Sequence, residues 1–190
     1  MQCPPLCQQP GWCQKISKAL KGQQQAWQQL VQRYEKTVYL YAMRMTSNAD
    51  DALDLTQETF VSVCRSLADF RHDSSFKTWL LRIAHFRIVE FYRRRKWFVD
   101  ESELEQLDAD PSQACPELAF GKLQTQQQLT EIMKRLPFEQ KLIVELKIFQ
   151  QLTFDVIGQQ LGMSDNTVKS KFYTALDKLK GLLEGRYDAA

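Results

Sequence analysis

The sequence predicts an all-α protein of two small helical domains joined by an acidic linker. Glycine and proline are scarce, at 7 and 6 of 190 residues, so long stretches contain no helix breaker. Hydrophobic residues make up 44% and charged residues 25% of the chain, which is a globular composition. Two regions of helical periodicity flank a segment, 100–117, that holds seven acids and no Lys or Arg.

Residues 1–14 are predicted to form a disordered tail. The start of the chain lacks the basic residues and continuous apolar core of a signal peptide, and no apolar run approaches the ~18 residues of a membrane span. We therefore expect a cytoplasmic protein without membrane insertion of its own. Cys3, Cys7 and Cys13 could bind metal or sense oxidants, or could belong to a tolerant tail. No histidine lies nearby and their spacing matches no zinc signature, so no metal site or cofactor is predicted.

The first domain is predicted to span 15–98 and to begin with two amphipathic helices. Apolar residues recur with a helical period from Gln23 to Met45. A second helix follows the turn-like "TSNAD", with Asp50 and Asp51 near its start, where the helix dipole favours acids. Its buried face holds Ala52, Leu55, Thr56, Thr59, Phe60, Val63 and Leu67. Its opposite face carries Asp54, Gln57, Glu58, Val61 and Arg65.

The third helix of this domain contains "TWLLRIAHFRIVEFYRRRKWF", residues 78–98. Its predicted core face holds Phe76, Leu80, Ile83, Ala84 and Phe91, and Arg87 projects into that face, as a side chain at one end of the core would. One flank stacks Trp79, Arg82, Phe86, Glu90 and Arg93, and the run of Arg93, Arg94, Arg95 and Lys96 surrounds the helix end.

This mixture of rings and cations favours DNA with partly exposed bases. From Arg71 to Lys96 there are eight Lys or Arg against two acids, a local charge of +6 in a chain of net charge +2. Cations neutralise phosphates, and aromatic faces stack on unpaired bases. The alternative is a solvated helix end whose cations complement the dipole, although four consecutive cations exceed what a dipole of about half a charge requires.

The acidic linker is predicted to span 99–122 and the second domain 123–185. The helical pattern of the second domain runs from about Leu123 to Leu136, breaks at Pro137 and resumes from Phe138 to Phe149. In "TFDVIGQQLGMSDNTVKSKFYTALDKL", residues 153–179, the spacing is that of a helix-turn-helix. Gly158 permits close crossing, Gly162 makes the turn, and Ser164 caps the second helix. The shared core is predicted to hold Ile157, Leu161, Val168 and Phe172. Candidate groups for base edges and phosphates are Asp165, Asn166, Thr167, Lys169, Ser170, Lys171 and Tyr173. A helical hairpin that binds no DNA is the alternative.

Taken as a whole, the chain resembles the extracytoplasmic-function (ECF) sigma factors of the bacterial sigma-70 family. "DLTQETF" and "FKTWLLRIA" in the first domain, followed at the right distance by "LP" and "GMSDNTVKSKF", form a specific combination. The resemblance implies a region 2 that docks on the clamp of core RNA polymerase and opens the minus-10 element. It also implies a region 4 that reads the minus-35 element and meets the polymerase flap.

The resemblance implies roles for individual residues. Asp54, Gln57 and Glu58 match the polymerase-binding motif, and Val61 lies beside them. The positions that hold a flipped base of the minus-10 strand are Phe70, Arg71, His72, Ser74, Ser75, Phe76 and Lys77, to which the basic flank adds Arg82, Phe86, Arg93, Arg94 and Arg95. The minus-35 helix begins at Ser164 and carries the polar groups named above, and Trp79 is expected in the core. The linker's acids fit a basic path through the polymerase, and they fit a solubilising spacer equally well. An anti-sigma factor is an implied partner.

Three departures from the family pattern stand out. Leu53 lies between Ala52 and Asp54 where the family usually reads "AED", and Phe86 replaces the asparagine of "ARN". The resemblance implies base selection by that amide in the family, so its loss leaves hydrogen-bonded selection at Phe86 open, with stacking as the alternative. Gly158 replaces the usual alanine, which loosens the helix but keeps its close crossing.

Two other classes of protein share part of this pattern. A stand-alone helix-turn-helix regulator that does not engage polymerase would share the second domain, but would not need the face of Asp54, Gln57 and Glu58. "SSFK" at 74–77 and "SDN" at 164–166 echo two beta-lactamase motifs, but the Lys-Thr-Gly strand is missing. No set of nucleophile, base and orienting group can be assembled, so no catalytic activity is expected.

Overall fold

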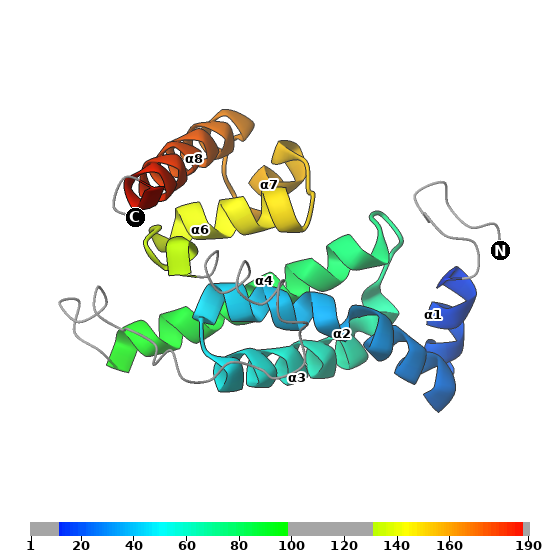
Figure 1. Cartoon of the computed structure of the whole chain (residues 1–190). Coiled ribbons are helices and arrows are strands. Elements are labelled where there is room, and N and C mark those ends of the chain that lie inside the picture. The colour runs from blue at the N-terminus through cyan, green and yellow to red at the C-terminus, as the bar shows by residue number, and fades with distance from the viewer. Residues whose placement is uncertain (1–11, 99–130, 188–190) are drawn as a thin grey trace. The chain divides into compact units, whose positions relative to one another are not determined.

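The computed structural model describes residues 12–98 and 131–187, with side chains from 14–95 and 131–182. The chain divides into two compact units, Met1–Asp110 and Pro111–Ala190. Every regular element in the described ranges is helical (Figure 1), so the all-α prediction is confirmed. Outside the described residues lie the predicted linker at 99–122 and the first eight residues of the predicted second domain, 123–130. Cys3, Cys7 and the side chain of Cys13 lie outside them as well.

The first unit contains five helical elements in the described range. These are α1 (Trp12–Leu20), α2 (Gln24–Thr46), α3 (Ala49–Ser66), the 3-10 turn η1 (Leu67–Asp69) and α4 (Phe76–Phe98). Helix α1 was not predicted, and it begins inside the segment that we expected to be tail. It contacts α2 and buries Ile16, but a helix this short repeats its apolar positions too few times to give a clear period.

The core of the first unit lies among α2, α3 and α4. The predicted stripe of α3 is buried, including Ala52, Leu55, Phe60 and Val63. On α2, Leu30, Val38, Tyr41, Ala42 and Met45 are buried, whereas Trp27, Val31 and Tyr34 of the same stripe are half-buried. On α4 the buried side chains are Phe76, Leu80, Leu81, Ala84 and Ile88. Ile83 and Phe91, predicted for this face, are only half-buried. Because α4 contacts both α2 and α3, its buried face is rotated toward Leu81 and Ile88.

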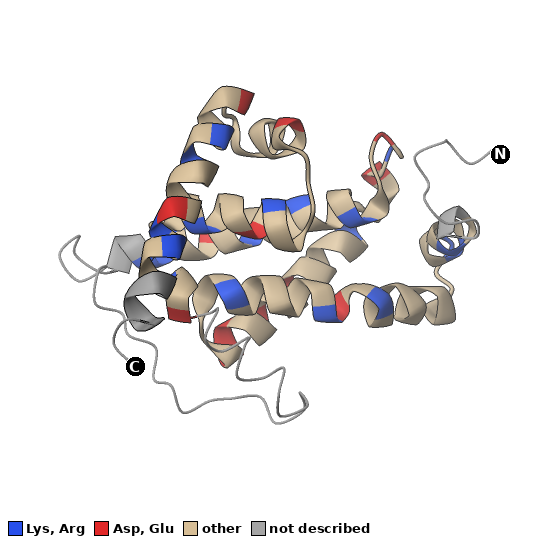
Figure 2. Cartoon of the chain, turned by 45° about the horizontal axis from the view of Figure 1, so that its top comes forward, with Lys and Arg blue, Asp and Glu red and all other residues tan. Residues whose placement is uncertain are grey.

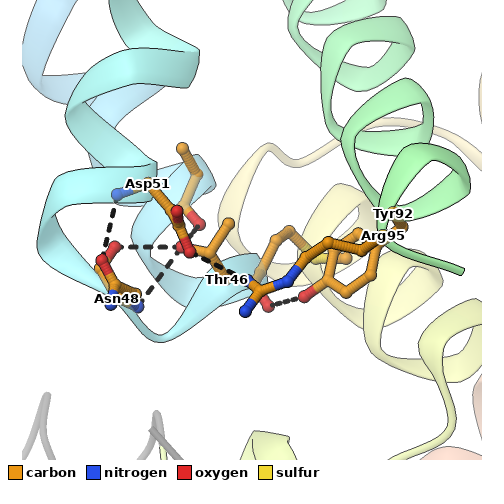
Figure 3. A network of polar contacts seen from close by, with 7 residues as sticks. Thr46, Asn48, Asp51, Tyr92 and Arg95 are labelled. Atoms are coloured by element: carbon orange, nitrogen blue, oxygen red, sulfur yellow. Dashed lines mark hydrogen bonds and ion pairs between the residues drawn. The ribbon is translucent and has the colours of Figure 1, made fainter. Parts of the chain in front are cut away.

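A polar network joins the turn between α2 and α3 to the end of α4 (Figure 3). Ser47 adopts the left-handed conformation with φ of 58°, and the side chain of Asn48 caps α3 by accepting from the backbone N–H of Asp51 at 3.0 Å. From α4, Tyr92 donates to the Met45 carbonyl at 2.6 Å, and Arg95 pairs with Asp51 at 3.0 Å. Burial raises the pKa of Tyr92 to about 12, so its hydroxyl remains a donor at neutral pH.

The second unit contains a helical stretch at 131–134, then α6 (Phe138–Val144), η2 (Glu145–Phe149), α7 (Phe154–Leu161) and α8 (Asp165–Tyr187). Pro137 separates the first stretch from α6, as predicted. The pattern from Phe138 to Phe149 predicted one regular helix, but η2 is π-helical. At the π turn, Gln150 donates to the fully buried carboxylate of Glu145 at 2.9 Å. The wider turn brings these two polar groups together inside the unit.

Helices α7 and α8 form the predicted helix-turn-helix. Gly162 ends α7 in the left-handed conformation, with φ of 67°, and Ile157, Val168 and Phe172 are buried, whereas Leu161 is half-buried. A Cβ atom added to Gly158 would lie 2.7 Å from the backbone oxygen of Met163. The absence of a side chain at Gly158 therefore lets the turn fold back closely on α7.

We expect Gly158→Val to lower the free energy of unfolding of the second unit by about 1–3 kcal/mol, because the added atoms must displace backbone. The matched control is Gly181→Ala on α8, where an added Cβ meets nothing within 4 Å. That change should raise stability by up to about 1 kcal/mol through helix propensity. Urea unfolding of both variants measures the difference, and equal effects would contradict the close approach at Gly158.

Candidate nucleic-acid and protein interfaces

The outer face of α3 is a mixed apolar and acidic surface. Asp54, Gln57 and Glu58 are exposed, as predicted from the periodicity, and Val61 is 50% exposed. Leu53 lies on the same side of the helix and is 48% exposed. We call these five residues the docking face. Exposed Leu and Val side chains among carboxylates suit a protein interface, whose centre is apolar and whose rim is polar.

The loop before α4 holds its residues in a tight arrangement. His72 has φ of 62°, and its ring lies 4.4 Å from that of Phe70. Phe70 and Phe76 are buried and pack with Trp79. Ser75 accepts from the backbone N–H of Thr78 at 3.1 Å and so caps α4.

The predicted minus-10 residues of this loop divide into two groups. Arg71 is exposed, and His72, Ser74, Ser75 and Lys77 are partly exposed. The rings of Phe70 and Phe76 instead face the core, where they can support the loop but present little surface to a base. Trp79, expected in the core, is half-buried.

The exposed flank of α4 carries alternating cations and apolar groups. Arg82 and Arg93 are exposed, and between them Phe86 is 63% and Val89 36% exposed. The four residues are spaced by four, three and four positions, which places them along one side of the helix. We call them the stripe. Arg87, predicted to project into the core face, is half-buried and donates to Ser62 Oγ at 2.9 Å and to Glu90 at 2.8 Å.

The arginine run at the end of α4 is not uniformly free. Figure 2 shows both Lys or Arg and Asp or Glu on the helices, so each cation is judged by its partners. Arg94 pairs with Glu90 at 3.3 Å and Arg95 with Asp51 at 3.0 Å. Arg93 forms no ion pair with any residue that the structure describes. Arg93 can therefore bind a phosphate directly, whereas Arg94 and Arg95 must first leave their carboxylate partners.

His85 is a half-buried neutral group between α4 and α2. Its Nδ1 lies 3.5 Å from the hydroxyl of Tyr41, and burial lowers its pKa from 6.5 to about 4. Between pH 6.5 and 4, His85 is therefore protonated in the unfolded chain but remains neutral in the folded protein. Above pH 6.5 His85 is neutral in both states and does not reduce the free energy of unfolding. As pH falls from 6.5 to 4, protonation of the unfolded chain lowers that free energy.

We expect the first unit to lose about 2 kcal/mol of stability from this group at pH 5 relative to pH 7. His85→Gln, which cannot take up the proton, should remove that part of the loss. His72→Gln, at the other histidine, is the matched control and should keep it. Thermal unfolding of the three proteins at both pH values gives the comparison, and a parallel fall in His85→Gln would exclude His85 as the cause.

In the second unit, α8 presents its N-terminal half as predicted. Ser164 accepts from the backbone N–H of Thr167 at 3.1 Å, which confirms the cap. Asn166, Thr167 and Ser170 are exposed, and Tyr173 is 58% exposed. Two cations are already engaged, because Lys169 pairs with Asp165 at 2.6 Å and Lys171 pairs with Glu139 of α6. This surface suits polar contacts to a major groove.

Sequence reasoning did not anticipate several participants of these surfaces. Leu53 was predicted only as a departure from a family pattern, although its position opposite the buried stripe of α3 is a signal of exposure. Val89 was absent from the predicted flank. The partners of Arg94 and Arg95 were also missed. Among the described residues, no cluster of His, Cys, Asp or Glu could hold a metal ion, and no helix is both long and apolar enough to cross a membrane.

The fold and its surfaces are typical of a helical DNA-binding protein with two units. The first unit also carries the docking face, which suits a protein partner. Comparison with protein families agrees part by part. Residues 30–98 match the model of sigma-70 region 2, and residues 126–179 match sigma-70 region 4. The chain belongs to the sigma-70 family, in its ECF group.

Individual relatives point the same way. The chain is 31% identical to RNA polymerase sigma factor YlaC of Bacillus subtilis over 153 residues, which covers 80% of this chain and 88% of YlaC. It is also 31% identical over 159 residues to ECF RNA polymerase sigma factor SigE of Mycolicibacterium smegmatis, which covers 83% of this chain but 62% of SigE. The fold is similar to that of sigma factor RpoE from Bartonella quintana, solved in complex with the anti-sigma factor NepR, with a TM-score of 0.69 and 20% identity over 83% of this chain and 96% of that one. The alternative of a stand-alone regulator is not favoured, because region 2 is matched as well as region 4.

Proposed function

We propose that this sigma factor binds core RNA polymerase through the docking face of α3 and directs it to promoters with paired minus-35 and minus-10 elements. The single observation that carries the proposal is the arrangement of the first unit. Its α3 presents exposed Leu53 and Val61 among carboxylates, while α4 presents exposed Phe86 and Val89 between arginines. One small unit thus offers one surface for a protein and another for nucleic acid.

The α4 surface and the loop before it engage the minus-10 element. Arg71, Lys77, Arg82 and Arg93 supply charge for phosphates, and Phe86 supplies a ring for an unpaired base. The buried rings of Phe70 and Phe76 support the loop before α4 from its core side. Arg94 and Arg95 contribute once they exchange Glu90 and Asp51 for phosphate.

The second unit reads the minus-35 element with α8. Ser164, Asn166, Thr167 and Ser170 line the start of the helix with groups that both donate and accept hydrogen bonds. Lys169, Lys171 and Tyr173 lie further along, where they would meet the phosphate backbone. Asp165 holds Lys169 at 2.6 Å and so sets the direction of that side chain before DNA arrives.

An anti-sigma factor is a proposed regulatory partner. RpoE of Bartonella quintana, whose fold is similar, was solved with the anti-sigma factor NepR. In this chain, the apolar side chains of the docking face are the surface that such a partner would cover to exclude polymerase. We further propose that the chain is cytoplasmic, as its polymerase partner requires, and has no catalytic activity of its own, since sigma factors in general are DNA-binding regulators.

The test is a reconstitution of the full chain with core RNA polymerase, followed by size-exclusion chromatography and retention of genomic DNA fragments. The proposal predicts a one-to-one complex that retains a defined set of fragments that core polymerase alone does not retain. If the chain fails to join core polymerase but retains specific fragments by itself, the proposal is wrong and the stand-alone regulator replaces it.

A further inference from the structure

Helix α1 and the start of α2 carry cations and no acids. The first 34 residues of the chain contain no Asp or Glu, and their cations are Lys15, Lys18, Lys21 and Arg33. Of the 25 Lys and Arg in the chain these are 4, which leaves 21 against all 23 acids. The positive sign of the net charge of +2 therefore comes from this stretch. Because the sigma-70 region 2 model matches residues 30–98, α1 lies before the matched range.

The end of α1 is fixed by its backbone. Gly22 has φ of 77°, and its N–H donates to the Ala19 carbonyl at 3.0 Å. The N–H of Gln23 donates to the Lys18 carbonyl at 3.1 Å, which completes the Schellman arrangement of a helix that ends at a glycine. Buried Ile16 lies on α1, which contacts α2. The corner between the two helices therefore has a defined backbone shape.

The side of α1 turned away from the buried Ile16 carries two available cations. Lys18 and Lys21 are exposed, and neither forms an ion pair with any residue that the structure describes. Gln24 and Gln25, which begin α2 directly after the turn, are exposed as well. We call Lys18, Lys21, Gln24 and Gln25 the basic corner. Unlike two members of the arginine run, its cations have no carboxylate to leave before they bind an anion.

The chemistry of the basic corner suits a phosphate backbone. Ammonium groups neutralise phosphates and release their counterions, and glutamine amides can donate to phosphate and sugar oxygens. The four side chains include no aromatic ring on which an unpaired base could stack. No carboxylate side chain in the first 34 residues repels a polyanion. Leu20, which is 48% exposed on α1, is the feature that would suit an acidic protein surface instead.

The position of the basic corner favours DNA over a protein. At the start of α4, Phe76 packs on Tyr34 of α2, with ring centroids 5.3 Å apart. Farther along both helices, Tyr92 donates to the Met45 carbonyl, so α2 and α4 run in the same direction. Gln24 precedes Tyr34 by ten residues, which is about 15 Å of helix. The basic corner and the loop before α4 thus lie at the same end of α2 (Figure 1). A DNA backbone that extends past the loop at this end reaches the corner.

From these observations we propose that the basic corner is a further phosphate-binding site of the first unit. Lys18 and Lys21 bind the promoter backbone within about ten base pairs, one turn of the duplex, of the base at the loop before α4. The site adds affinity and salt dependence without reading sequence. The inference rests on the proposed function, because the complex with polymerase must bring promoter DNA to the first unit.

Ethylation interference of phosphates tests the contact directly. Promoter DNA with randomly ethylated phosphates is bound by the complex of core RNA polymerase with the full chain. Ethylated positions that are depleted from the bound fraction mark the phosphates that binding requires. We expect a small group of such phosphates within about ten base pairs of the base at the loop, and this group should lose its sensitivity in the double variant Lys18→Gln, Lys21→Gln. Sensitive phosphates elsewhere should persist, and the melting temperature should stay unchanged because both side chains are exposed.

Salt dependence measures the size of the contribution. Each lysine that meets a phosphate should contribute about 0.7–0.9 to the slope of log affinity against log salt. Near 0.1 M salt, the loss of one such contact should lower promoter affinity roughly three- to tenfold. Lys18→Arg, which keeps the charge, should retain both the slope and the affinity. Lys36→Gln is the matched control, because it removes one charge at an exposed lysine farther along α2 and should leave both unchanged.

The outcomes separate this inference from the proposed function. If the double variant forms the complex but keeps the wild-type slope and interference pattern, the basic corner does not meet DNA and the inference is wrong, while the proposed function stands. If the double variant instead weakens binding to polymerase, and Leu20→Ser does so too, the corner docks an acidic protein surface, which also overturns the inference. If the wild-type complex does not form or binds no promoter DNA, the proposed function fails and this inference fails with it.

Discussion

Replacing Asp54 and Val61 together by lysine is expected to weaken binding to core RNA polymerase by about 100-fold or more. Both side chains are exposed on α3, so the change leaves the core intact. Central interface residues contribute about 2 kcal/mol or more each, and 1.4 kcal/mol corresponds to tenfold. Lysine also places a strongly hydrated charge where the docking face is apolar, and reverses a charge where it is acidic.

The control for this prediction is Gln32→Lys with Glu35→Lys on α2. These side chains are also exposed, and the double change adds the same net charge of +3 as the test variant. Fluorescence titration of labelled protein with core polymerase should give wild-type affinity for the control. If both double variants weaken binding equally, total charge and not the docking face governs association. If the test variant binds normally but supports no transcription, the role of the face lies in a later step.

The second large effect is expected at the arginine run. Replacing Arg93, Arg94 and Arg95 by alanine should lower promoter opening by roughly tenfold to 100-fold while polymerase binding stays within about twofold. Each neutralised phosphate releases counterions, so the slope of log affinity against log salt should fall by about 0.7–0.9 for every phosphate that the variant no longer neutralises. Fluorescence of a base analogue in the minus-10 segment, followed at several salt concentrations, measures both quantities.

The single variants separate the three arginines. Arg93→Ala should account for the largest share, because Arg94 and Arg95 must first leave Glu90 and Asp51. Those two exposed pairs stabilise the fold by at most about 1 kcal/mol each, so the proteins remain folded. If polymerase binding fell before promoter opening, the run would belong to the polymerase interface and the assignment to DNA would be wrong.

Much of the fold was predictable because it depends on local periodicity. The stripes of α2 and α3, the break at Pro137 and the turn at Gly162 each follow from residues near one another in the chain. Helix α1 was missed, since Ile16 is the one fully buried residue among its described side chains, 14–20, and gives no period. The face of α4 was misplaced for another reason. Its orientation is set by contact with two other helices, and only the assembled unit determines which of Leu81, Ile83 and Ile88 is covered.

The surfaces were predictable in composition but not in pairing. Periodicity on α3 placed Asp54, Gln57, Glu58 and Val61 on the outer side, where the structure has them. The run of arginines could be counted, but the pair between Arg95 and Asp51 spans 44 positions and depends on how α4 passes the start of α3. The same holds for Arg87, whose anchor Ser62 belongs to another helix. Tertiary contacts decide which charges remain available for DNA.

The central claim is tested most directly by transcription itself. Core RNA polymerase, with and without the full chain, is given a genomic fragment library, and the initiated RNAs are sequenced. The account predicts defined start sites only in the presence of the chain, preceded by paired upstream elements. Core polymerase that neither binds the chain nor initiates with it, while the chain alone retains specific DNA, would contradict the account.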